Sequence, residues 1–218
     1  MPIIISPSIL GGSFSNMEKT ILEINESRAE YIHFDVMDGD FVPNLTFGPQ
    51  FIDNLRSYSN KVFDVHLMIN RVEKFIDNYI EAGSDIISFH VEIEDDIKSL
   101  ISRIKKNNIK CGIAIKPKTP WNKIQPYLDD IDQVIVMTVE PGFGGQIFMN
   151  DQVNKIKNIS NCIKSKNLDV KIEIDGGVNY ETGKTCKEVG ADILVAGSFL
   201  FKQGDLIKAT NSLFDALS

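Results

Sequence analysis

The sequence has few cysteines, no run of basic residues and no long apolar segment. Its three cysteines (Cys111, Cys162 and Cys186) are far apart and form no CxxC pair. A disulfide framework or a zinc knuckle is therefore disfavoured, and we expect reduced thiols in a cytoplasmic protein. The net charge of −7 provides no positive field for nucleic acid or an anionic membrane. The apolar start lacks a basic region and is interrupted by Pro7, so we expect neither a signal peptide nor a membrane-spanning helix.

Nucleotide-binding motifs and domain linkers are also missing. There is no Walker lysine and no GxGxxG fingerprint, which disfavours nucleotide binding. No low-complexity segment divides the 218 residues, and a hydrophobic content of 43% is enough for one large core. We therefore expect residues 1–218 to form a single domain.

Eight short runs rich in β-branched residues recur along the chain, and most are separated by stretches with helical periodicity. One such stretch places Ile97, Leu100, Ile101 and Ile104 on a single helix face. The predicted strands are Ile3–Ser6, Tyr31–Asp35, Val62–His66, Ile86–His90, Cys111–Ile115, Val134–Met137, Ile172–Asp175 and Ile193–Ala196.

Two joints between helix and strand closely resemble each other. They read EAGSDII at 81–87 and EVGADIL at 188–194, and ESRAEYI at 26–32 is a looser copy. Gly83 and Gly190 can each end a helix in the left-handed conformation, three residues before a buried strand. Repeated helix-then-strand units favour parallel pairing and predict an α/β fold, a (β/α)8 TIM barrel. A doubly wound sheet built from the same units is the competing prediction.

Two local signals predict where helices begin. Ser15 and Glu18 have the spacing of a capping box, and Pro49 suits the first turn of another helix.

Four polar residues fall at the carboxyl ends of predicted strands, where a TIM barrel places its chemistry. His33 and Asp35 end the second strand, His66 the third and Asp175 the seventh. Residues i and i+2 of a strand face the same side, so His33 and Asp35 can both reach inward. Two imidazoles and two carboxylates suit one divalent metal ion, Zn²⁺, Fe²⁺, Mn²⁺ or Co²⁺, and the residues do not choose among these.

The same residues also have a purely structural interpretation. A single inward histidine is commonly a hydrogen-bonded core residue, and Asp-Gly is commonly a turn. Burying two carboxylates without a counter-charge is costly, however, which favours the metal site. His90 also ends a predicted strand, and we expect it to support a ligand or the fold. Asp38 and Asp40 are expected to belong to a loop that covers the substrate.

Glycines gather after the sixth, seventh and eighth predicted strands, where barrels of this type bind phosphate. Backbone N–H groups can approach an anion closely at glycine, and these stretches contain no lysine or arginine. The residues concerned are Gly142, Gly144, Gly145, Gly176, Gly177, Gly197 and Ser198.

Three methionines (Met37, Met68 and Met137) lie at or just after strand ends near these residues. They could fill gaps in the core, or they could form an apolar lining that keeps water from a charged intermediate. Both interpretations remain open.

Six motifs between residues 6 and 198 together resemble the ribulose-phosphate 3-epimerase family: SPSIL, HFDVMDGDFVPNLTFGP, DVHLM, MTVEPGFGGQ, DGGV and VAGS. The resemblance implies an isomerase of the pentose phosphate pathway with a TIM barrel and one divalent metal ion. It implies that D-ribulose 5-phosphate and D-xylulose 5-phosphate interconvert by two-base proton transfer through a metal-stabilised enediolate.

The resemblance also assigns roles to residues. His33, Asp35, His66 and Asp175 become metal ligands, and Asp35 and Asp175 become the acid/base pair. Ser8 and His66 contact the sugar. Gly142, Phe143, Gly144, Gly145, Asp175, Gly176, Gly177, Gly197 and Ser198 become further substrate contacts, largely around the phosphate, and a homo-oligomer is implied. Gly11 and Gly12, where a polar residue is common, and Phe199, where a small one is usual, depart from the family pattern.

Three alternative functions can be compared with this one. A related 3-epimerase of a six-carbon ketose phosphate, such as allulose 6-phosphate, uses the same residues. A non-catalytic barrel that binds sugar phosphates is disfavoured because binding alone does not need both aspartates. A decarboxylase-type relative requires a DxKxxD motif, but here His66 stands where the lysine belongs.

Overall fold

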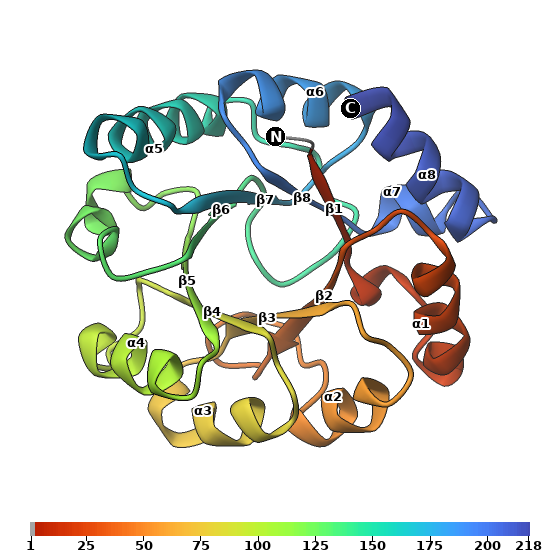
Figure 1. The fold of residues 1–218 in the computed structure, drawn as a ribbon, viewed down its shortest axis with the longest axis horizontal. Helices are drawn as coiled ribbons and strands as arrows, with labels where there is room; N and C mark the ends of the chain where they lie inside the picture. Colours follow the sequence, from red (N-terminus) through yellow and green to blue (C-terminus); the bar gives the residue numbers. More distant parts are fainter. Residues whose placement is uncertain (1–2) are drawn as a thin grey trace.

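The protein's structure, a computed structural model, describes residues 3–218. Eight parallel strands pair in the order β1-β8-β7-β6-β5-β4-β3-β2, and a parallel bridge between Ser8 and His33 brings β1 beside β2. The ring of strands is closed, with helices outside it (Figure 1). The strands are β1 Ile4–Pro7, β2 Tyr31–Met37, β3 Val62–Met68, β4 Ile86–His90, β5 Lys110–Ile115, β6 Gln133–Met137, β7 Lys171–Asp175 and β8 Ile193–Ala196. The predicted TIM barrel is confirmed, and the doubly wound alternative is wrong.

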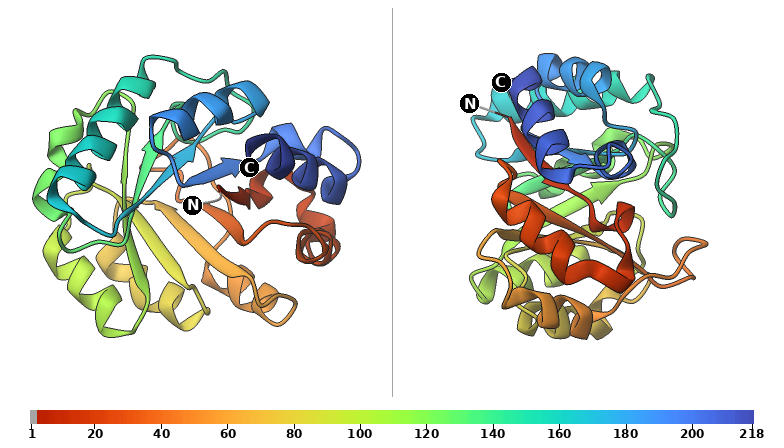
Figure 2. Two further views of the ribbon diagram at one scale, coloured as in Figure 1. Left: turned by 45° about the horizontal axis from the view of Figure 1, so that its top comes forward. Right: turned by 90° about the vertical axis from the view of Figure 1, so that its right-hand side faces the viewer.

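The helices cover the outside of the barrel (Figure 2). In α4, the four residues that the periodicity placed on one face (Ile97, Leu100, Ile101 and Ile104) are buried. The helices are α1 Met17–Glu26, α2 Pro49–Arg56, α3 Val72–Glu81, α4 Ile97–Lys106, α5 Gln152–Lys166, α6 Tyr180–Val189, α7 Ser198–Phe201 and α8 Leu206–Leu217.

The repeated joints have a common hydrogen bond that explains their sequence. Gly83 and Gly190 both have positive φ, 84° and 113°, as a left-handed helix end requires. The aspartate two residues later accepts a backbone N–H from the start of the preceding strand. Asp85 accepts from Phe63 and Asp192 from Ile172, each at 2.8 Å. The joint therefore ends one helix and fixes the register of the next strand pair.

The helix-start predictions have mixed outcomes. Pro49 is the first residue of α2, as predicted. The capping box at Ser15 and Glu18 is wrong, because Ser15 lies in a 3₁₀ turn, Phe14–Asn16, and α1 begins after it. Phe14 packs edge-on against Phe47, with ring centroids 5.7 Å apart, and this tertiary contact accompanies the turn.

The connection from β5 to β6 contains no α-helix. It consists of two 3₁₀ turns, Trp121–Lys123 and Gln125–Tyr127. Pro117, Pro120 and Pro126 lie in this segment, and a proline inside an α-helix removes a hydrogen bond and clashes with the preceding turn.

The barrel interior is layered along its axis. The first residues of five strands close the amino-terminal end as an apolar plug: Ile4, Tyr31, Val62, Ile86 and Ile193. Because inward side chains alternate along a strand, the residues two positions later on β1 to β4 also face inward, and they are polar and fully buried: Ser6, His33, Asp64 and Ser88. Gln133 of β6 (1% exposed) and Glu173 of β7 are polar and buried as well. The loops after β2 and β6 project from the end of the barrel away from the N-terminus (Figure 2, right).

Candidate metal centre and substrate pocket

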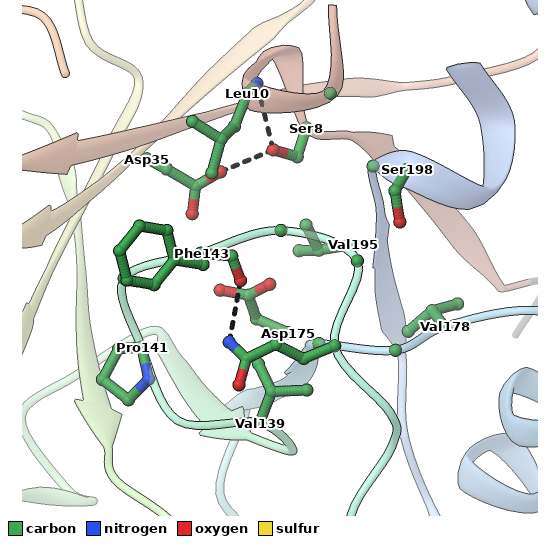
Figure 3. Close-up of a pocket in the computed structure, with 18 of the residues that line it drawn as sticks. Ser8, Leu10, Asp35, Val139, Pro141, Phe143, Asp175, Val178, Val195 and Ser198 are labelled. Carbon is green, nitrogen blue, oxygen red and sulfur yellow. Dashed lines mark hydrogen bonds between the residues drawn. The ribbon is translucent and has the colours of Figure 1, made fainter. Parts of the chain in front are cut away.

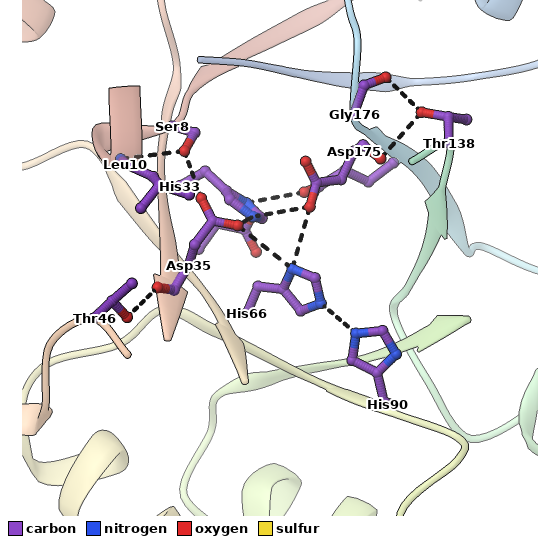
Figure 4. Close-up of polar contacts among 12 residues, drawn as sticks. Ser8, Leu10, His33, Asp35, Thr46, His66, His90, Thr138, Asp175 and Gly176 are labelled. Carbon is purple, nitrogen blue, oxygen red and sulfur yellow. Dashed lines mark hydrogen bonds and ion pairs between the residues drawn. The ribbon is translucent and has the colours of Figure 1, made fainter. Parts of the chain in front are cut away.

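The structure brings together the four residues predicted to bind a metal. His33 and Asp35 lie in β2, and Asp35 pairs across the sheet with His66 of β3. Asp175 ends β7. One donor atom from each residue can be chosen so that all four atoms lie within 4.8 Å of one another. Figure 4 shows the two imidazoles and the two carboxylates converging on one point.

The distances between these donor atoms suit a metal site better than hydrogen bonding. His33 Nε2 lies 3.5 Å from Asp35 Oδ1 and 3.9 Å from Asp175 Oδ2. His66 Nδ1 lies 3.4 Å from Asp175 Oδ2 and 4.0 Å from Asp35 Oδ1. Ligand bonds of about 2.1 Å in a tetrahedral site place the ligand atoms roughly 3.4 Å apart. The cluster is therefore close to the dimensions of such a site.

Two nitrogen atoms of the cluster have no hydrogen-bond partner in the described part of the chain. They are His33 Nε2 and His66 Nδ1, and both are buried. Buried polar atoms are nearly always satisfied because an unpaired one loses its hydration without compensation. The two nitrogens face the carboxylates of Asp35 and Asp175. This donor set fits a divalent cation.

Negative charge dominates the electrostatics of the cluster. Burial alone lowers the pKa of His33, but the carboxylates of Asp35 and Asp64 outweigh burial and hold it well above its ordinary value. Burial opposes ionisation of Asp35, yet the adjacent His33 holds the pKa of Asp35 below its ordinary value. Burial and the charge of Asp64 raise the pKa of Glu173 well above its ordinary value. A bound cation would neutralise part of this excess charge.

A buried polar cluster beneath the predicted ligands escaped the sequence prediction. Asp64 Oδ2 lies 2.7 Å from His33 Nδ1. Gln133 donates to Asp64 at 3.2 Å and to Glu173 at 2.7 Å. The sequence spacing could have indicated these residues. Asp64 precedes His66 by two residues and Glu173 precedes Asp175 by two, and residues two apart face the same side of a strand.

His90, a second inward histidine, extends the cluster on the other side of His66. Its Nε2 lies 3.0 Å from His66 Nε2, and its Nδ1 lies 3.0 Å from Glu92 Oε2. His90 is fully buried, and mainly for this reason its pKa is lowered to about 4. The prediction that His90 supports a ligand or the fold agrees with these contacts.

A pocket opens above the cluster, at the carboxyl ends of the strands (Figure 3). Asp35 and Asp175 both line it, and they come from β2 and β7, strands that β1 and β8 separate in the ring. The other predicted contacts that line it are Ser8, Gly142, Phe143, Gly144, Gly145, Gly176, Gly177, Gly197, Ser198, Met37, Met68 and Met137. His66, also predicted to contact the sugar, is fully buried below the pocket wall.

Several wall residues were not predicted from the sequence. They lie within the motifs of the family resemblance, and their apolar or uncharged side chains gave no separate signal: Leu10, Val139, Pro141, Gln146, Val178 and Val195. Among the described residues, neither Asp38 nor Asp40 lines the pocket. Asp38 instead accepts backbone N–H groups of Asp40, Phe41 and Asn70, and so it shapes the loop after β2.

Glycine is required where the loop after β7 turns. Gly176 and Gly177 have φ of +121° and +64°. A Cβ at Gly176 would lie 2.5 Å from Val139 Cγ2, and one at Gly177 would lie 2.7 Å from the backbone nitrogen of Phe148. Both contacts are too close for a side chain, so the backbone itself forms this wall.

The departures from the family pattern also border the pocket. Gly11 and Phe199 line it. A Cβ at Gly11 would lie 2.7 Å from Cδ2 of Phe201, and the Phe199 ring packs edge-on against Tyr180 at 5.1 Å. A side chain at Gly11 would therefore require Phe201 to move, and Phe199 has a defined packing partner.

The eight-stranded barrel, with two acids at a pocket above its strand ends, places the protein in the class of TIM-barrel enzymes. Within that class, this chain belongs to the ribulose-phosphate 3 epimerase family, whose sequence model matches residues 4–201. The resemblance predicted from the motifs is confirmed.

Individual relatives match over nearly the whole chain. Ribulose-phosphate 3-epimerase of Bacillus subtilis is 41% identical over 210 residues, which are 96% of this chain and 97% of the relative. The Escherichia coli enzyme of the same name is 35% identical, covering 99% and 96%. The chloroplastic ribulose-5-phosphate-3-epimerase of Arabidopsis thaliana is 39% identical, covering 97% and 76%. The protein is accordingly an epimerase, an enzyme of the isomerase class.

Solved structures that share the fold are more distant in sequence. KGPDC from Streptococcus mutans has a TM-score of 0.74 at 14% identity, covering 100% of this chain and 98% of that one. Orotidine 5'-phosphate decarboxylase from Pyrococcus horikoshii has a TM-score of 0.71 at 14% identity, covering 98% and 99%. At this level of identity, the two structures support a shared barrel fold and not a shared function. Across residues 3–218, no helix has the length and apolar character needed to span a membrane.

Proposed function

We propose that this epimerase is metal-dependent and inverts C3 of D-ribulose 5-phosphate to give D-xylulose 5-phosphate, a reaction of the pentose phosphate pathway. One observation carries the proposal. The unpartnered nitrogens of His33 and His66 meet Asp35 and Asp175 directly below a pocket, in a chain whose relatives are named for this reaction.

His33, Asp35, His66 and Asp175 would hold one divalent cation, for which Zn²⁺, Fe²⁺, Mn²⁺ and Co²⁺ are all suitable. When bound, the cation would stabilise the negative charge that develops on substrate oxygens as a proton leaves carbon. The adjacent histidines and the buried layer beneath fix the two carboxylates in place.

Asp35 and Asp175 supply the acid and the base. Inverting a carbon next to a ketone requires a proton to leave one face and another to arrive on the opposite face. One carboxylate takes the C3 proton, and the electron pair of the broken C–H bond is delocalised into the carbonyl. The other residue, as the carboxylic acid, returns a proton to C3 from the opposite face. Their placement on separate strands, both at the pocket, supports this division of roles.

The rest of the pocket would bind and shield the sugar phosphate. None of the described lining residues is a lysine or arginine, so backbone N–H groups of the glycine loops after β6, β7 and β8 would bind the phosphate. Ser8 and His66 would contact the sugar. Met37, Met68 and Met137 are buried and line the pocket, where they would exclude water.

Ser8→Ala is expected to lower kcat about 10- to 100-fold. Ser8 Oγ donates to Asp35 Oδ2 at 2.5 Å, and a hydrogen bond to a charged group is worth roughly 1.5–3 kcal/mol. Steady-state kinetics measures the loss. Ser165→Ala, on the exposed surface of α5, is the matched control and should leave kcat unchanged. An unaltered kcat in Ser8→Ala would show that this bond does not orient Asp35 for proton transfer.

We also propose that the protein acts in the cytoplasm as a homo-oligomer. Its three cysteines are free, as a reducing compartment requires. The oligomer rests on the family resemblance, and sedimentation of the purified chain tests it.

Metal analysis combined with a coupled epimerase assay tests the central proposal. We expect one divalent ion per chain and a kcat/KM on ribulose 5-phosphate at least about tenfold above that on allulose 6-phosphate, since a pocket can discriminate one extra carbon by that factor. A preference for the six-carbon substrate would support the related epimerase instead. Binding of either sugar phosphate without turnover would indicate a non-catalytic barrel.

A further inference from the structure

His66 meets His90 edge to edge. The facing Nε2 atoms are 3.0 Å apart, the ring centroids are 5.0 Å apart, and the ring planes differ by only 25°. Nearly coplanar rings joined through their nitrogens have the geometry of an in-plane N–H···N hydrogen bond. Figure 4 shows the two rings meeting in this way, with the other nitrogen of His66 directed at the carboxylates.

The direction of this hydrogen bond follows from Glu92. An ionised carboxylate only accepts hydrogen bonds, and Glu92 Oε2 lies 3.0 Å from His90 Nδ1. Nδ1 of His90 therefore carries a proton. In a neutral imidazole the other nitrogen is then an acceptor, so Nε2 of His90 accepts from His66. The proton of His66 lies on Nε2, and its lone pair lies on Nδ1, the atom without a partner.

The surroundings keep His90 neutral and Glu92 fixed. His90 is fully buried and packs on the Phe41 ring at 4.8 Å. The Lys116 ammonium lies 3.5 Å from the centroid of that same ring. This nearby positive charge opposes protonation of His90. Oε1 of Glu92 accepts the backbone N–H of Lys116 at 2.8 Å, which ties the carboxylate to the end of β5.

His33 is held by a different partner, at its other ring nitrogen. Asp64 faces Nδ1 of His33 at 2.7 Å, and Nε2 is the nitrogen left without a partner. Each of the two histidines therefore has an anchored ring nitrogen and a bare one, and the bare ones point at the same carboxylates.

We propose that His90 and Glu92 are positioning residues that lock His66 in the Nε2–H tautomer and so set the affinity of the site for a divalent cation. The inference rests on the proposed metal site. It concerns the shell of hydrogen bonds behind the ligand, where loss of a partner commonly weakens metal binding about 10- to 100-fold.

Two substitutions of His90 separate hydrogen bonding from packing. His90→Gln keeps an acceptor for His66 and a donor for Glu92, whereas His90→Leu has neither. Competition with a chromophoric chelator measures the Kd for Zn²⁺ or Co²⁺. We expect His90→Leu to raise the Kd about 10- to 100-fold and His90→Gln to raise it less than about threefold. Unchanged affinity in a folded His90→Leu protein would overturn the proposal.

Thermal unfolding of the metal-free variants distinguishes positioning from a purely structural role. We expect His90→Leu to bind metal more weakly than His90→Gln. The difference between their Kd values should be larger than a difference in stability, measured by Tm, can account for. Glu92→Ala, at a partly exposed position, provides a second test if His90→Leu does not fold, and it should also weaken metal binding. Wild-type affinity in Glu92→Ala would contradict the proposed role of the carboxylate.

The tautomers can be read directly in the metal-free protein. The chain has three histidines, all in this cluster, so two-bond ¹H–¹⁵N correlation spectra of an untagged sample contain three imidazoles. We expect the proton of His66 on Nε2 and that of His90 on Nδ1. A His66 proton on Nδ1 would overturn the inference. A wild-type chain that bound no divalent cation would instead overturn the proposed metal site, and the spectra would still decide the tautomer.

Discussion

Asp35→Asn and Asp175→Asn are each expected to lower kcat by at least about three orders of magnitude. Acid–base catalysis by a positioned group typically contributes 10²- to 10⁴-fold, and each substitution also removes a charged ligand from the proposed metal site. The fold should persist, because Asp35 and Asp175 lie at the pocket and each loses only a charge in a strongly acidic cluster. Coupled kinetics and circular dichroism measure the two quantities.

Isotope exchange gives a sharper outcome than the loss of turnover. An enzyme with a single remaining base can still remove the C3 proton of one epimer and return a solvent deuteron to the same face. In D₂O we therefore expect each variant to exchange the C3 proton of one substrate epimer only, with the other epimer exchanged by the other variant. Exchange of both epimers by the same variant would contradict the two-base scheme.

Asp40→Asn is the matched control for these two variants. Asp40 is exposed and belongs to the same strand-to-loop segment as Asp35, but it does not line the pocket among the described residues. We expect its kcat to remain within about threefold of wild type, since a surface substitution away from the site changes little. A loss as large as that of Asp35→Asn would mean that the loop aspartates take part in the chemistry.

Complete removal of divalent metal is expected to lower kcat by about 10³-fold or more. Electrostatic stabilisation by a cation is worth several kcal/mol, and each 1.36 kcal/mol is tenfold in rate. Dialysis against a strong chelator, followed by titration with Zn²⁺, Mn²⁺, Co²⁺ or Fe²⁺ under anaerobic conditions, measures the loss and its recovery.

The same preparation should also change in stability. A ligand at 100 times its Kd stabilises the native state by about 2.7 kcal/mol, so the Tm should rise on adding metal. His33→Gln is the control, because it removes one proposed ligand and should reduce the shift in Tm. Full turnover by a protein shown to be free of metal would exclude the proposed role of the cluster.

Most of the barrel was predictable from the sequence because its signals are local. Gly83 and Gly190 mark helix ends by their backbone conformation. His33, Asp35, His66 and Asp175 were found because parallel strands bring their carboxyl ends to one edge, and the structure places their donor atoms together. Their roles in metal binding and proton transfer remain predictions.

The partners behind the ligands were not predictable in the same way. Gln133 contacts Asp64 and Glu173 from a different strand, and only the closed barrel brings these three together. The tautomer of His66 depends on a chain of contacts that ends at Glu92. The 3₁₀ turn at Ser15 was likewise missed, since local spacing does not report the packing of Phe14 on Phe47.

The barrel closes between β1 and β2 with little backbone pairing. Among the described residues, the other neighbouring strands share ladders of several pairs, whereas this seam has the one bridge from Ser8 to His33. The Ser8 hydroxyl adds a bond to Asp35 across the same seam. The groups that complete the cylinder are thus those assigned to the reaction. Substitutions that remove these contacts are consequently expected to weaken the closure of the ring as well as the proposed reaction, whereas Asp35→Asn keeps an acceptor for Ser8.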